Sequence, residues 1–296
     1  MSIRQTSWLR WPTMADPLSI AELLKQARYL LTEADTDTSQ LDAELLLAHL
    51  LQKSRTWLHT WPDKLVEEEI IADFNPLLQR RQRGEPIAYL LGKQSFWTLE
   101  LKVTADTLIP RPDTELLVEE ALSTIPTEQT WEIADLGTGS GAIALAIASE
   151  RPAARIIATD QSAAALAIAE ENASRYPFDN ITFKQGSWFE PIRQQLFDLI
   201  LSNPPYIAAG DAHLGQGDIR FEPDSALSSG SSGLDDLQQI IHNAIPQLKS
   251  GGRLIVEHGY DQGNAVRSLF EQHHYIEIST KRDLSGQERV SYGVQP

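Results

Sequence analysis

Apolar residues recur every three to four positions through the first part of the chain. One stripe begins at Ile20, a second at Leu41 and a third at Ile70, and turn and capping residues separate them. This spacing places the apolar side chains on one face of each helix. The pattern therefore predicts a small all-helical domain over residues 14–90, preceded by a poorly ordered leader at residues 1–13.

The pattern changes after residue 90. Residues 91–112 combine helix-breaking glycine and proline with a short alternating segment, which predicts a hairpin linker between two domains. Asp113 is expected to cap a helix over Thr114–Leu122.

Beyond this helix, short and continuously apolar segments alternate with helical ones. The strand candidates cover residues 131–136, 155–159, 181–185, 197–202, 253–257, 275–280 and 288–293, and the helix candidates cover 142–149, 163–173 and 234–248. Such alternation is typical of a parallel sheet covered by helices on both faces. Residues 113–296 are therefore predicted to form a doubly wound α/β domain, which binds ligands at the carboxyl ends of its strands.

Composition narrows the possible partners. The formal charge of −16 disfavours nucleic acid, which proteins bind through lysine and arginine, so no direct nucleic-acid partner is expected. No apolar run approaches the roughly 20 residues of a membrane span, so no membrane association is expected. The lack of cysteine excludes thiol chemistry and fits the cytoplasm. The histidines show no metal-ligand spacing, so no metal is predicted. Glu257-His258 and His273-His274 are interpreted as surface or supporting groups.

A glycine-rich turn follows the first strand candidate. The segment Asp135–Gly141 lets the backbone approach a ligand closely at a helix N-terminus. Gly137, Gly139 and Ala142 also satisfy a dinucleotide-binding fingerprint. Asp160 follows the second strand candidate, where a carboxylate either accepts hydrogen bonds from both ribose hydroxyls or caps the next helix. Together these features predict a nucleoside cofactor, without separating NAD from S-adenosylmethionine.

The segment Asn203-Pro204-Pro205-Tyr206 follows the fourth strand candidate, at the same edge of the sheet. Its two prolines fix two φ angles and donate no hydrogen bonds, so the segment is a rigid, extended turn. An amide nitrogen is a poor nucleophile because its lone pair is delocalised. The Asn203 side-chain oxygen and the Pro204 carbonyl can accept both of its N–H bonds and aim the lone pair at a sulfonium methyl group. This segment favours S-adenosylmethionine and predicts methyl transfer to a planar amide-type nitrogen; the alternative is a purely structural turn.

The chain resembles the release-factor glutamine methyltransferase family (PrmC/HemK type) over nearly its whole length. The matching segments are residues 81–89, 108–115, 135–141, 203–206 and 216–223. The Asn-Pro-Pro-Tyr motif is shared with adenine-N6 DNA methyltransferases, whereas Pro-Arg-Pro-Asp-Thr-Glu and Arg-Phe-Glu-Pro are more specific. The resemblance implies a helical substrate-binding domain followed by a Rossmann-like, seven-stranded class I S-adenosylmethionine methyltransferase domain. It also implies N5 methylation of the glutamine in the Gly-Gly-Gln motif of peptide chain release factors, which act in translation termination.

The same resemblance implies roles for individual residues. The residues implied to contact the cofactor are Gly137, Thr138, Gly139, Ser140, Gly141, Asp160 at the ribose, Trp188 at the adenine, and Asn203. Those implied in catalysis are Asn203, Pro204 and Tyr206, and Pro205 joins them in lining the amide pocket. Residues 207–233, which are rich in glycine, serine and aspartate, are expected to form a substrate-facing lid, with a merely mobile loop as the alternative.

Other functions stay open at this point. Glutamine methylation of a ribosomal protein is disfavoured by the Arg-Phe-Glu-Pro segment. An adenine-N6 nucleic-acid methyltransferase is disfavoured by the charge and by the lack of an obvious target-recognition domain. An NAD-dependent oxidoreductase needs a hydride-transfer site, which Asn-Pro-Pro-Tyr does not supply, and a non-catalytic binding module leaves that segment without a purpose.

Overall fold

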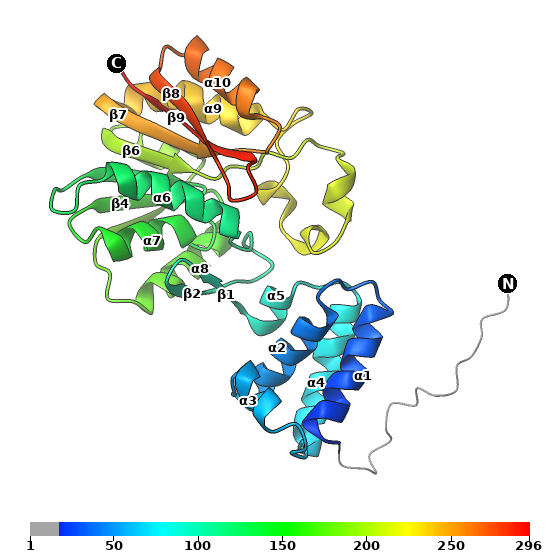
Figure 1. Ribbon diagram of the computed structural model, residues 1–296. Helices are drawn as coiled ribbons and strands as arrows, with labels where there is room; N and C mark the ends of the chain where they lie inside the picture. Colours follow the sequence, from blue (N-terminus) through cyan, green and yellow to red (C-terminus); the bar gives the residue numbers. More distant parts are fainter. Residues whose placement is uncertain (1–17) are drawn as a thin grey trace. The chain divides into compact units, whose positions relative to one another are not determined.

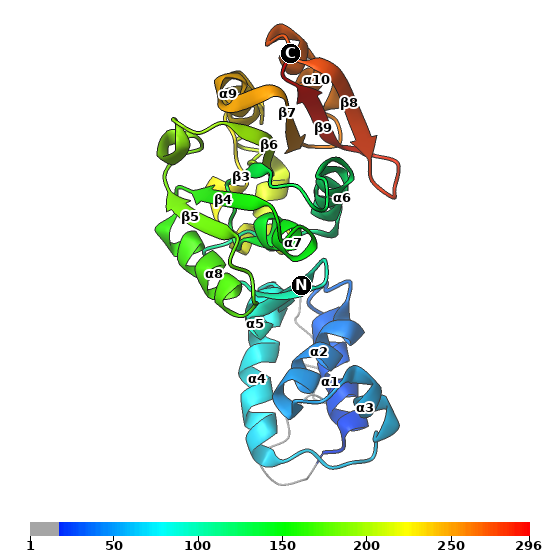
Figure 2. The same cartoon turned by 90° about the vertical axis from the view of Figure 1, so that its left-hand side faces the viewer.

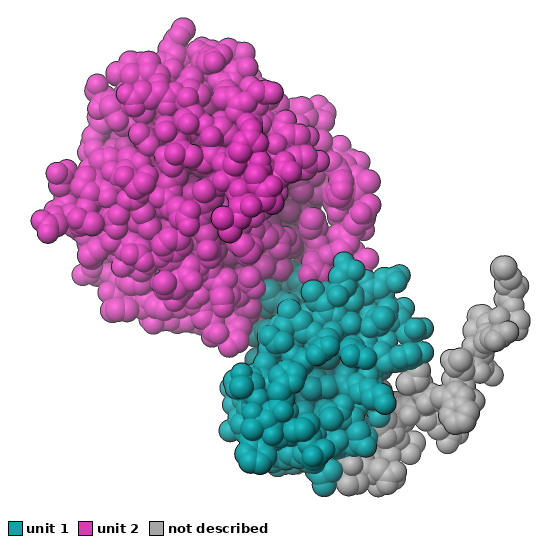
Figure 3. Space-filling view, viewed as in Figure 1, with its two compact units in different colours: residues 1–91 teal, residues 92–296 magenta. Residues whose placement is uncertain are grey.

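The computed structural model describes residues 18–296, so the leader expected at residues 1–13 lies outside the described residues. The chain divides into two compact units between Leu91 and Gly92 (Figure 3). The described part of the first unit contains the helices α1 (Ile20–Thr32), α2 (Ser39–Leu51), α3 (Arg55–Thr60), α4 (Glu68–Gln82) and α5 (Ile87–Leu91) (Figure 1). The predicted stripes correspond to α1, α2 and α4, whereas the short helices α3 and α5 were not predicted.

Local chemistry and packing together explain the helical unit. α1 begins at a capping box, in which the Glu22 backbone N–H donates to Ser19 Oγ at 3.3 Å and the Ser19 N–H donates to Glu22 Oε2 at 2.9 Å. The apolar faces of the helices share one core, to which Leu23, Leu46 and Phe74 each contribute a fully buried side chain. Burial of these faces supplies most of the stability of such short helices.

The second unit begins with an antiparallel hairpin of β1 (Lys93–Phe96) and β2 (Leu99–Lys102). Its main sheet has the order β5-β4-β3-β6-β7-β9-β8. The strands are β3 (Glu132–Leu136), β4 (Arg155–Asp160), β5 (Ile181–Gln185), β6 (Phe197–Ser202), β7 (Leu248–Glu257), β8 (Ile276–Arg282) and β9 (Glu288–Val294). β3 to β7 pair in parallel, and β9 pairs antiparallel with both β7 and β8. The predicted seven-stranded α/β fold is confirmed.

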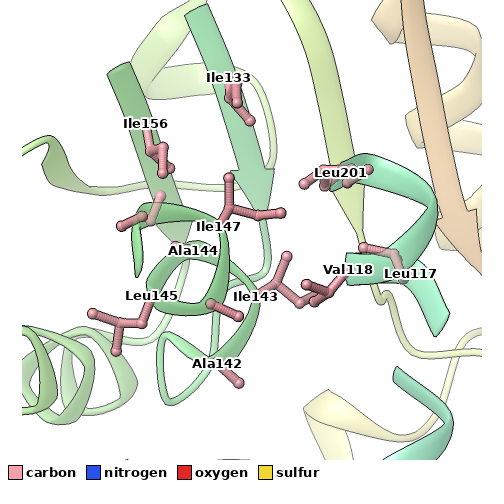
Figure 4. Close-up of a cluster of buried hydrophobic side chains, with 14 of the residues drawn as sticks. Leu117, Val118, Ile133, Ala142, Ile143, Ala144, Leu145, Ile147, Ile156 and Leu201 are labelled. Atoms are coloured by element: carbon pink, nitrogen blue, oxygen red, sulfur yellow. The ribbon is translucent and has the colours of Figure 1, made fainter. Parts of the chain in front are cut away.

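Helices cover both faces of this sheet. The helices are α6 (Glu115–Thr124), α7 (Ala142–Glu150), α8 (Ala163–Ser174), α9 (Asp235–Ala244) and α10 (Gly263–Gln272). α6 and α7 share one apolar core with the side chains of one sheet face, as Ile143, Ile147 and Leu201 illustrate (Figure 4). α9 and α10 share a second core with the other face, and Figure 2 shows α7 and α9 on opposite sides of the sheet. Both faces are buried, so the carboxyl edge of the sheet is where a ligand can reach the strands.

The predicted role of Asp113 as a helix cap is wrong. Pro112–Thr114 forms a 3₁₀ turn, α6 begins at Glu115, and its preceding residue Thr114 makes no side-chain cap bond. Proline is favoured in the first turn of a helix, so the helical backbone starts before Asp113 rather than after it. The Asp113 carboxylate instead lies 3.4 Å from Arg289 Nη2.

Candidate active site

The glycine-rich turn is held against the end of β4. The backbone N–H groups of Gly137 and Thr138 both donate to the Thr159 carbonyl at 2.9 Å. Gly137 has a φ of 72°, and a Cβ atom there would lie 3.1 Å from Cζ3 of Trp188. This position therefore requires glycine, both for its backbone conformation and for the close approach of the indole ring.

Two carboxylates support this turn. Asp135 is fully buried, and its Oδ2 accepts bonds from the Thr138 hydroxyl at 2.6 Å and the Ala144 N–H at 3.2 Å. Its Oδ1 has no partner among the described residues, and burial raises the pKa of this carboxyl to about 7. Asp160 accepts from the Gly139 N–H at 2.9 Å and the Ser162 N–H at 2.8 Å; burial raises its pKa and these bonds partly offset the rise. The alternative role of Asp160 as a helix cap is wrong, because Ser162 caps α8.

A cavity of about 480 Å³ opens beside this turn, within the usual size range of small-molecule sites. It brings together many of the residues singled out from the sequence: Gly137, Gly139, Asp160, Trp188, Asn203 and Pro205. Thr138, Ser140 and Gly141 line neither this cavity nor its neighbour; Thr138 and Ser140 are buried beneath the turn.

A second cavity, of about 80 Å³, adjoins the first and shares Leu108, Asn203 and Ala226 with it. Pro204 and Tyr206 also line it. A cavity this size holds a few groups as large as a water molecule, roughly the scale of a carboxamide. Asn203 therefore stands at the boundary between a large cavity and a small one.

Both ends of the Asn-Pro-Pro-Tyr segment are anchored through their side chains. Asn203 Nδ2 donates to Thr114 Oγ1 at 3.1 Å, and the Tyr206 hydroxyl donates to Glu257 Oε1 at 3.3 Å. Burial and the nearby Glu257 carboxylate raise the pKa of Tyr206, so its phenol is neutral at ordinary pH. No described residue donates a hydrogen bond to Asn203 Oδ1 or to the Pro204 carbonyl. Both of these acceptors are therefore free among the described residues.

Residues 207–233 contain short regular elements, and several of them line the small cavity. They contain the 3₁₀ turns η3 (Ala212–Gly215), η4 (Ile219–Phe221) and η5 (Asp224–Ala226), and Ile207 pairs with Ser228 in a parallel bridge. The buried carboxylate of Glu222 accepts the Ile109 N–H at 3.0 Å and pairs with Arg111. Burial raises the pKa of Glu222, and Arg111 partly counteracts it. This carboxylate joins residues 108–111 to the segment that lines the small cavity.

Sequence reasoning missed two supporting residues, Thr114 and Glu222, and left open whether Glu257 was a surface or a supporting group. Glu257-His258 was interpreted as surface or supporting groups, and the burial of both residues excludes the surface alternative. Burial raises the pKa of Glu257 to about 7, against the opposing effects of Thr114, Tyr206 and Arg289. Its position could have been predicted, because Glu257 ends a strand at the same sheet edge as Asn203.

The described residues contain no group of three or more histidine, cysteine, aspartate or glutamate side chains arranged to hold a metal ion. Within residues 18–296, every helix is too short or too polar to cross a bilayer.

The fold and the paired cavities define a class of protein. A sequence family described as a methyltransferase domain matches residues 128–289, and a methyltransferase from Pyrococcus furiosus has the same fold, with a TM-score of 0.51 and 16% identity over 73% of this chain and 96% of that one. The protein is therefore a methyltransferase.

Its particular family follows from closer relatives. The release factor glutamine methyltransferase of Aliivibrio fischeri is 50% identical over 93% of this chain and 97% of its own length. The enzyme of the same name from Xylella fastidiosa strain 9a5c is 49% identical over 90% of this chain and 97% of its own. Residues 22–92 match the PrmC N-terminal domain. The chain belongs to the release factor glutamine methyltransferase family.

Proposed function

We propose that the protein transfers a methyl group from S-adenosylmethionine to the side-chain nitrogen N5 of the glutamine in the Gly-Gly-Gln motif of peptide chain release factors. Its family membership supports release factors as substrates. The observation that carries the chemistry is the place of Asn203 at the boundary of both cavities, with two free acceptors, its own Oδ1 and the Pro204 carbonyl, in this segment.

The residues of the large cavity fit a nucleoside cofactor. The Asp160 carboxylate would accept the ribose hydroxyls, and the Trp188 ring would stack on the adenine. Gly139 leaves open space beside the cavity, since no atom lies within 4 Å of a Cβ built there. When bound, S-adenosylmethionine supplies an electrophilic methyl group on a positively charged sulfur and leaves as S-adenosylhomocysteine. A protein with a formal charge of −16 also attracts such a cation.

The small cavity would hold the glutamine carboxamide. Asn203 Oδ1 and the Pro204 carbonyl would each accept one N–H bond, which fixes the nitrogen with its lone pair facing the large cavity. Both acceptors also stabilise the positive charge that develops as the nitrogen gains a methyl group and before it loses a proton. Tyr206 would form the wall beside the amide, and Pro205 would keep the turn rigid. The proposal needs no general base before transfer, because the N–H becomes acidic only as the methyl arrives.

We also assign the helical domain, residues 14–90, to release-factor binding, and residues 113–296 to methyl transfer in the cytoplasm. The proposal includes no direct nucleic-acid partner, no membrane partner and no metal. Glutamine methylation of a ribosomal protein and adenine-N6 methylation of nucleic acid are the alternatives that a substrate comparison must separate.

The test is a comparison of substrates with radiolabelled S-adenosylmethionine. The purified protein is offered a release factor, the same factor with alanine in place of the Gly-Gly-Gln glutamine, a ribosomal protein mixture, and duplex DNA. We expect label on the unmodified release factor alone, with mass spectrometry placing one methyl group on that glutamine. Label on DNA or on ribosomal proteins in the absence of release-factor methylation would overturn the proposal.

A further inference from the structure

Residues 108–115 and 216–223, which carry much of the family resemblance, come together at the small cavity. Two residues of the first segment line it, as do one residue of the second segment and two that follow it: Leu108, Arg111, Ile219, Ala226 and Leu227. The two segments thus form facing parts of the cavity wall. Their separation sets the space that is left for a substrate group between them.

The carboxylate of Glu222 ties these two segments together. None of its side chain is exposed; its Oε2 accepts the Ile109 N–H at 3.0 Å, and its Oε1 accepts a hydrogen bond from Arg111 Nη2. Both carboxylate oxygens are therefore used, one by a main-chain group and one by a side chain of the opposite segment. The Arg111 side chain is 35% exposed and belongs to the cavity wall itself.

The backbone on each side of this contact is stiff. Arg111 stands between Pro110 and Pro112, and a residue before proline is confined to an extended conformation, which Arg111 has with φ −98° and ψ 146°. Glu222 precedes Pro223 and is extended as well, with φ −85° and ψ 156°. The 3₁₀ turns η4 and η5 lie directly before and after these two residues. We therefore expect a shift at Glu222 to move the cavity wall, because no flexible loop lies between them to absorb it.

Stability alone is a weak reason for such a contact, because desolvation of a buried ion pair offsets much of its attraction. Methyl transfer gives a stronger reason, since a misplacement of reacting groups by about 1 Å can cost about 10²-fold in rate. Leu108, the neighbour of Ile109, lines both cavities. The tie to Glu222 therefore acts where the proposed amide site meets the proposed cofactor site.

We propose that Glu222 is a positioning residue for methyl transfer. By holding Ile109 and Arg111, it fixes the separation of the small-cavity walls and thus the place of the glutamine amide relative to the methyl donor. This inference rests on the proposed function. It makes Arg111 the wall residue through which Glu222 acts, and it gives residues 108–115 and 216–223 a shared purpose.

The first test is Glu222→Gln, which keeps the size of the side chain. Glutamine has a single oxygen, so its NH₂ group must face either the Ile109 N–H or the Arg111 guanidinium, and one of the two ties is lost. We expect kcat with a release factor to fall by about 10- to 100-fold. KM should change by less than about threefold, because release-factor binding is assigned to the helical domain. S-adenosylmethionine affinity by calorimetry should stay close to that of the wild type.

The matched control is Glu120→Gln. Glu120 is also a buried glutamate, and it pairs with Arg253 at 3.4 Å and with Lys281 at 3.2 Å, but it lines neither cavity. Its replacement measures what the loss of a buried ion pair in this unit does to the fold alone. The melting temperature is expected to fall in both variants, whereas kcat should fall in Glu222→Gln alone.

A double-mutant cycle tests the route through Arg111. Arg111→Gln breaks the same contact from the other side, so the variant with both replacements should lose much less kcat than the product of the two single losses. We expect its kcat to be close to that of the slower single variant. Losses that multiply would overturn the assignment, because they would show that Arg111 and Glu222 act independently.

The outcomes separate this inference from the proposed function. A wild-type protein that methylates no release factor overturns the proposed function itself. An active wild type with unchanged kcat in Glu222→Gln overturns the inference alone. A parallel loss of cofactor affinity, or an equal loss of kcat in Glu120→Gln, also overturns it, because both results indicate general damage to the fold. If Glu222→Gln does not fold, Arg111→Lys takes its place with the same expected loss and the same contrary outcomes, since lysine keeps the charge but lacks the planar fork.

Discussion

Two pairs of buried carboxylates, one pair in each unit of the protein, are satisfied to different extents. In the helical unit, Asp42 and Glu44 are each 2% exposed, and each lies 2.6 Å from an arginine, Arg81 and Arg55 respectively. In the sheet unit, Asp135 is 0% exposed and Glu257 is 1% exposed, and each has one oxygen without a partner in the described part of the chain. All four carboxylates are buried, but in the described part of the chain only Asp135 and Glu257 keep an oxygen that lacks a hydrogen-bond partner.

The pKa values follow this difference. Burial would raise the pKa of Glu44, but hydrogen bonds from Gln40 and Arg55 outweigh it and keep the pKa below its ordinary value. Burial dominates for Asp135 and Glu257, whose pKa values rise to about 7. The paired carboxylates of the helical unit hold helices together. Asp135 and Glu257 lie toward the carboxyl ends of β3 and β7 and each keep an oxygen without a partner among the described residues, whereas the buried Glu120 and Glu222 of the same unit pair with arginines.

The largest expected effect comes from breaking a pair in the helical unit. Asp42→Ala removes the carboxylate that lies 2.6 Å from the buried Arg81 guanidinium, which should lower the unfolding free energy of this unit by about 3–5 kcal/mol. Chemical denaturation followed by circular dichroism measures it, with the exposed Asp73→Ala as control. Cofactor affinity should not change, since only residues of the second unit line the large cavity. A loss below about 1 kcal/mol would place Asp42 with ordinary surface pairs and end the comparison.

The next effect belongs to the site. Asn203→Ala removes an acceptor that the proposed transition state requires, so kcat should fall by about 10²- to 10³-fold, the scale for one preorganised polar group. Cofactor affinity should weaken much less, and the unfolding free energy should change little. Steady-state kinetics with a release factor measures the change, and the exposed Asn243→Ala is the control. Wild-type turnover in Asn203→Ala would contradict the proposed chemistry.

A smaller effect is expected at Asp160. Asp160→Ala removes the carboxylate that holds the Gly139 N–H and is proposed to bind the ribose. Hydrogen bonds to charged groups contribute about 1.5–3 kcal/mol, so S-adenosylmethionine affinity should fall by about 10- to 100-fold. Calorimetry measures this, with Asp198→Ala, whose carboxylate pairs with Lys249, as control. Unchanged affinity would remove Asp160 from the cofactor site.

The sequence predicted the fold well where apolar patterns were long. Each of the seven strands overlaps a predicted one, but β7 begins earlier than expected, at Leu248. Gly251 and Gly252 look like a loop in the sequence, yet hydrogen bonds with Gln295 continue the pairing through them. α10 was not predicted, because Val266 and Phe270 are its only large buried apolar residues and give too short a stripe.

The candidate site was predictable where its residues are consecutive. The glycine turn and the Asn-Pro-Pro-Tyr segment each form a local motif, and the structure brings Gly137, Trp188 and Asn203 to one cavity. The supporting role of Glu222 was missed, and that of Glu257 was left open, because both carboxylates meet the site only through tertiary contacts. Glu222 and Ile109, for example, are 113 positions apart in the chain and share a hydrogen bond. In a sequence, such a glutamate is indistinguishable from a surface charge.

The smallest expected effect tests the sign of the difference between the two units. The folded pKa of Glu257 is about 7 and its ordinary value is 4.5, so the folded state binds a proton that the unfolded state releases between these values. Burial, reinforced by Asp113, raises the pKa of this carboxyl and outweighs the lowering effects of Thr114, Tyr206 and Arg289. The contribution of Glu257 to stability therefore rises as pH falls from 7 toward 4.5, by about 1 kcal/mol between pH 7 and pH 6. Denaturation of wild type and Glu257→Gln at both pH values isolates this contribution from other groups, and Glu44→Gln in the helical unit is the matched comparison. Since the pKa of Glu44 is lowered, its contribution is complete above pH 4.5 and should be constant over the same interval. A wild type that gains nothing over Glu257→Gln between pH 7 and pH 6 would show that this carboxylate is as well satisfied as those of the helical unit.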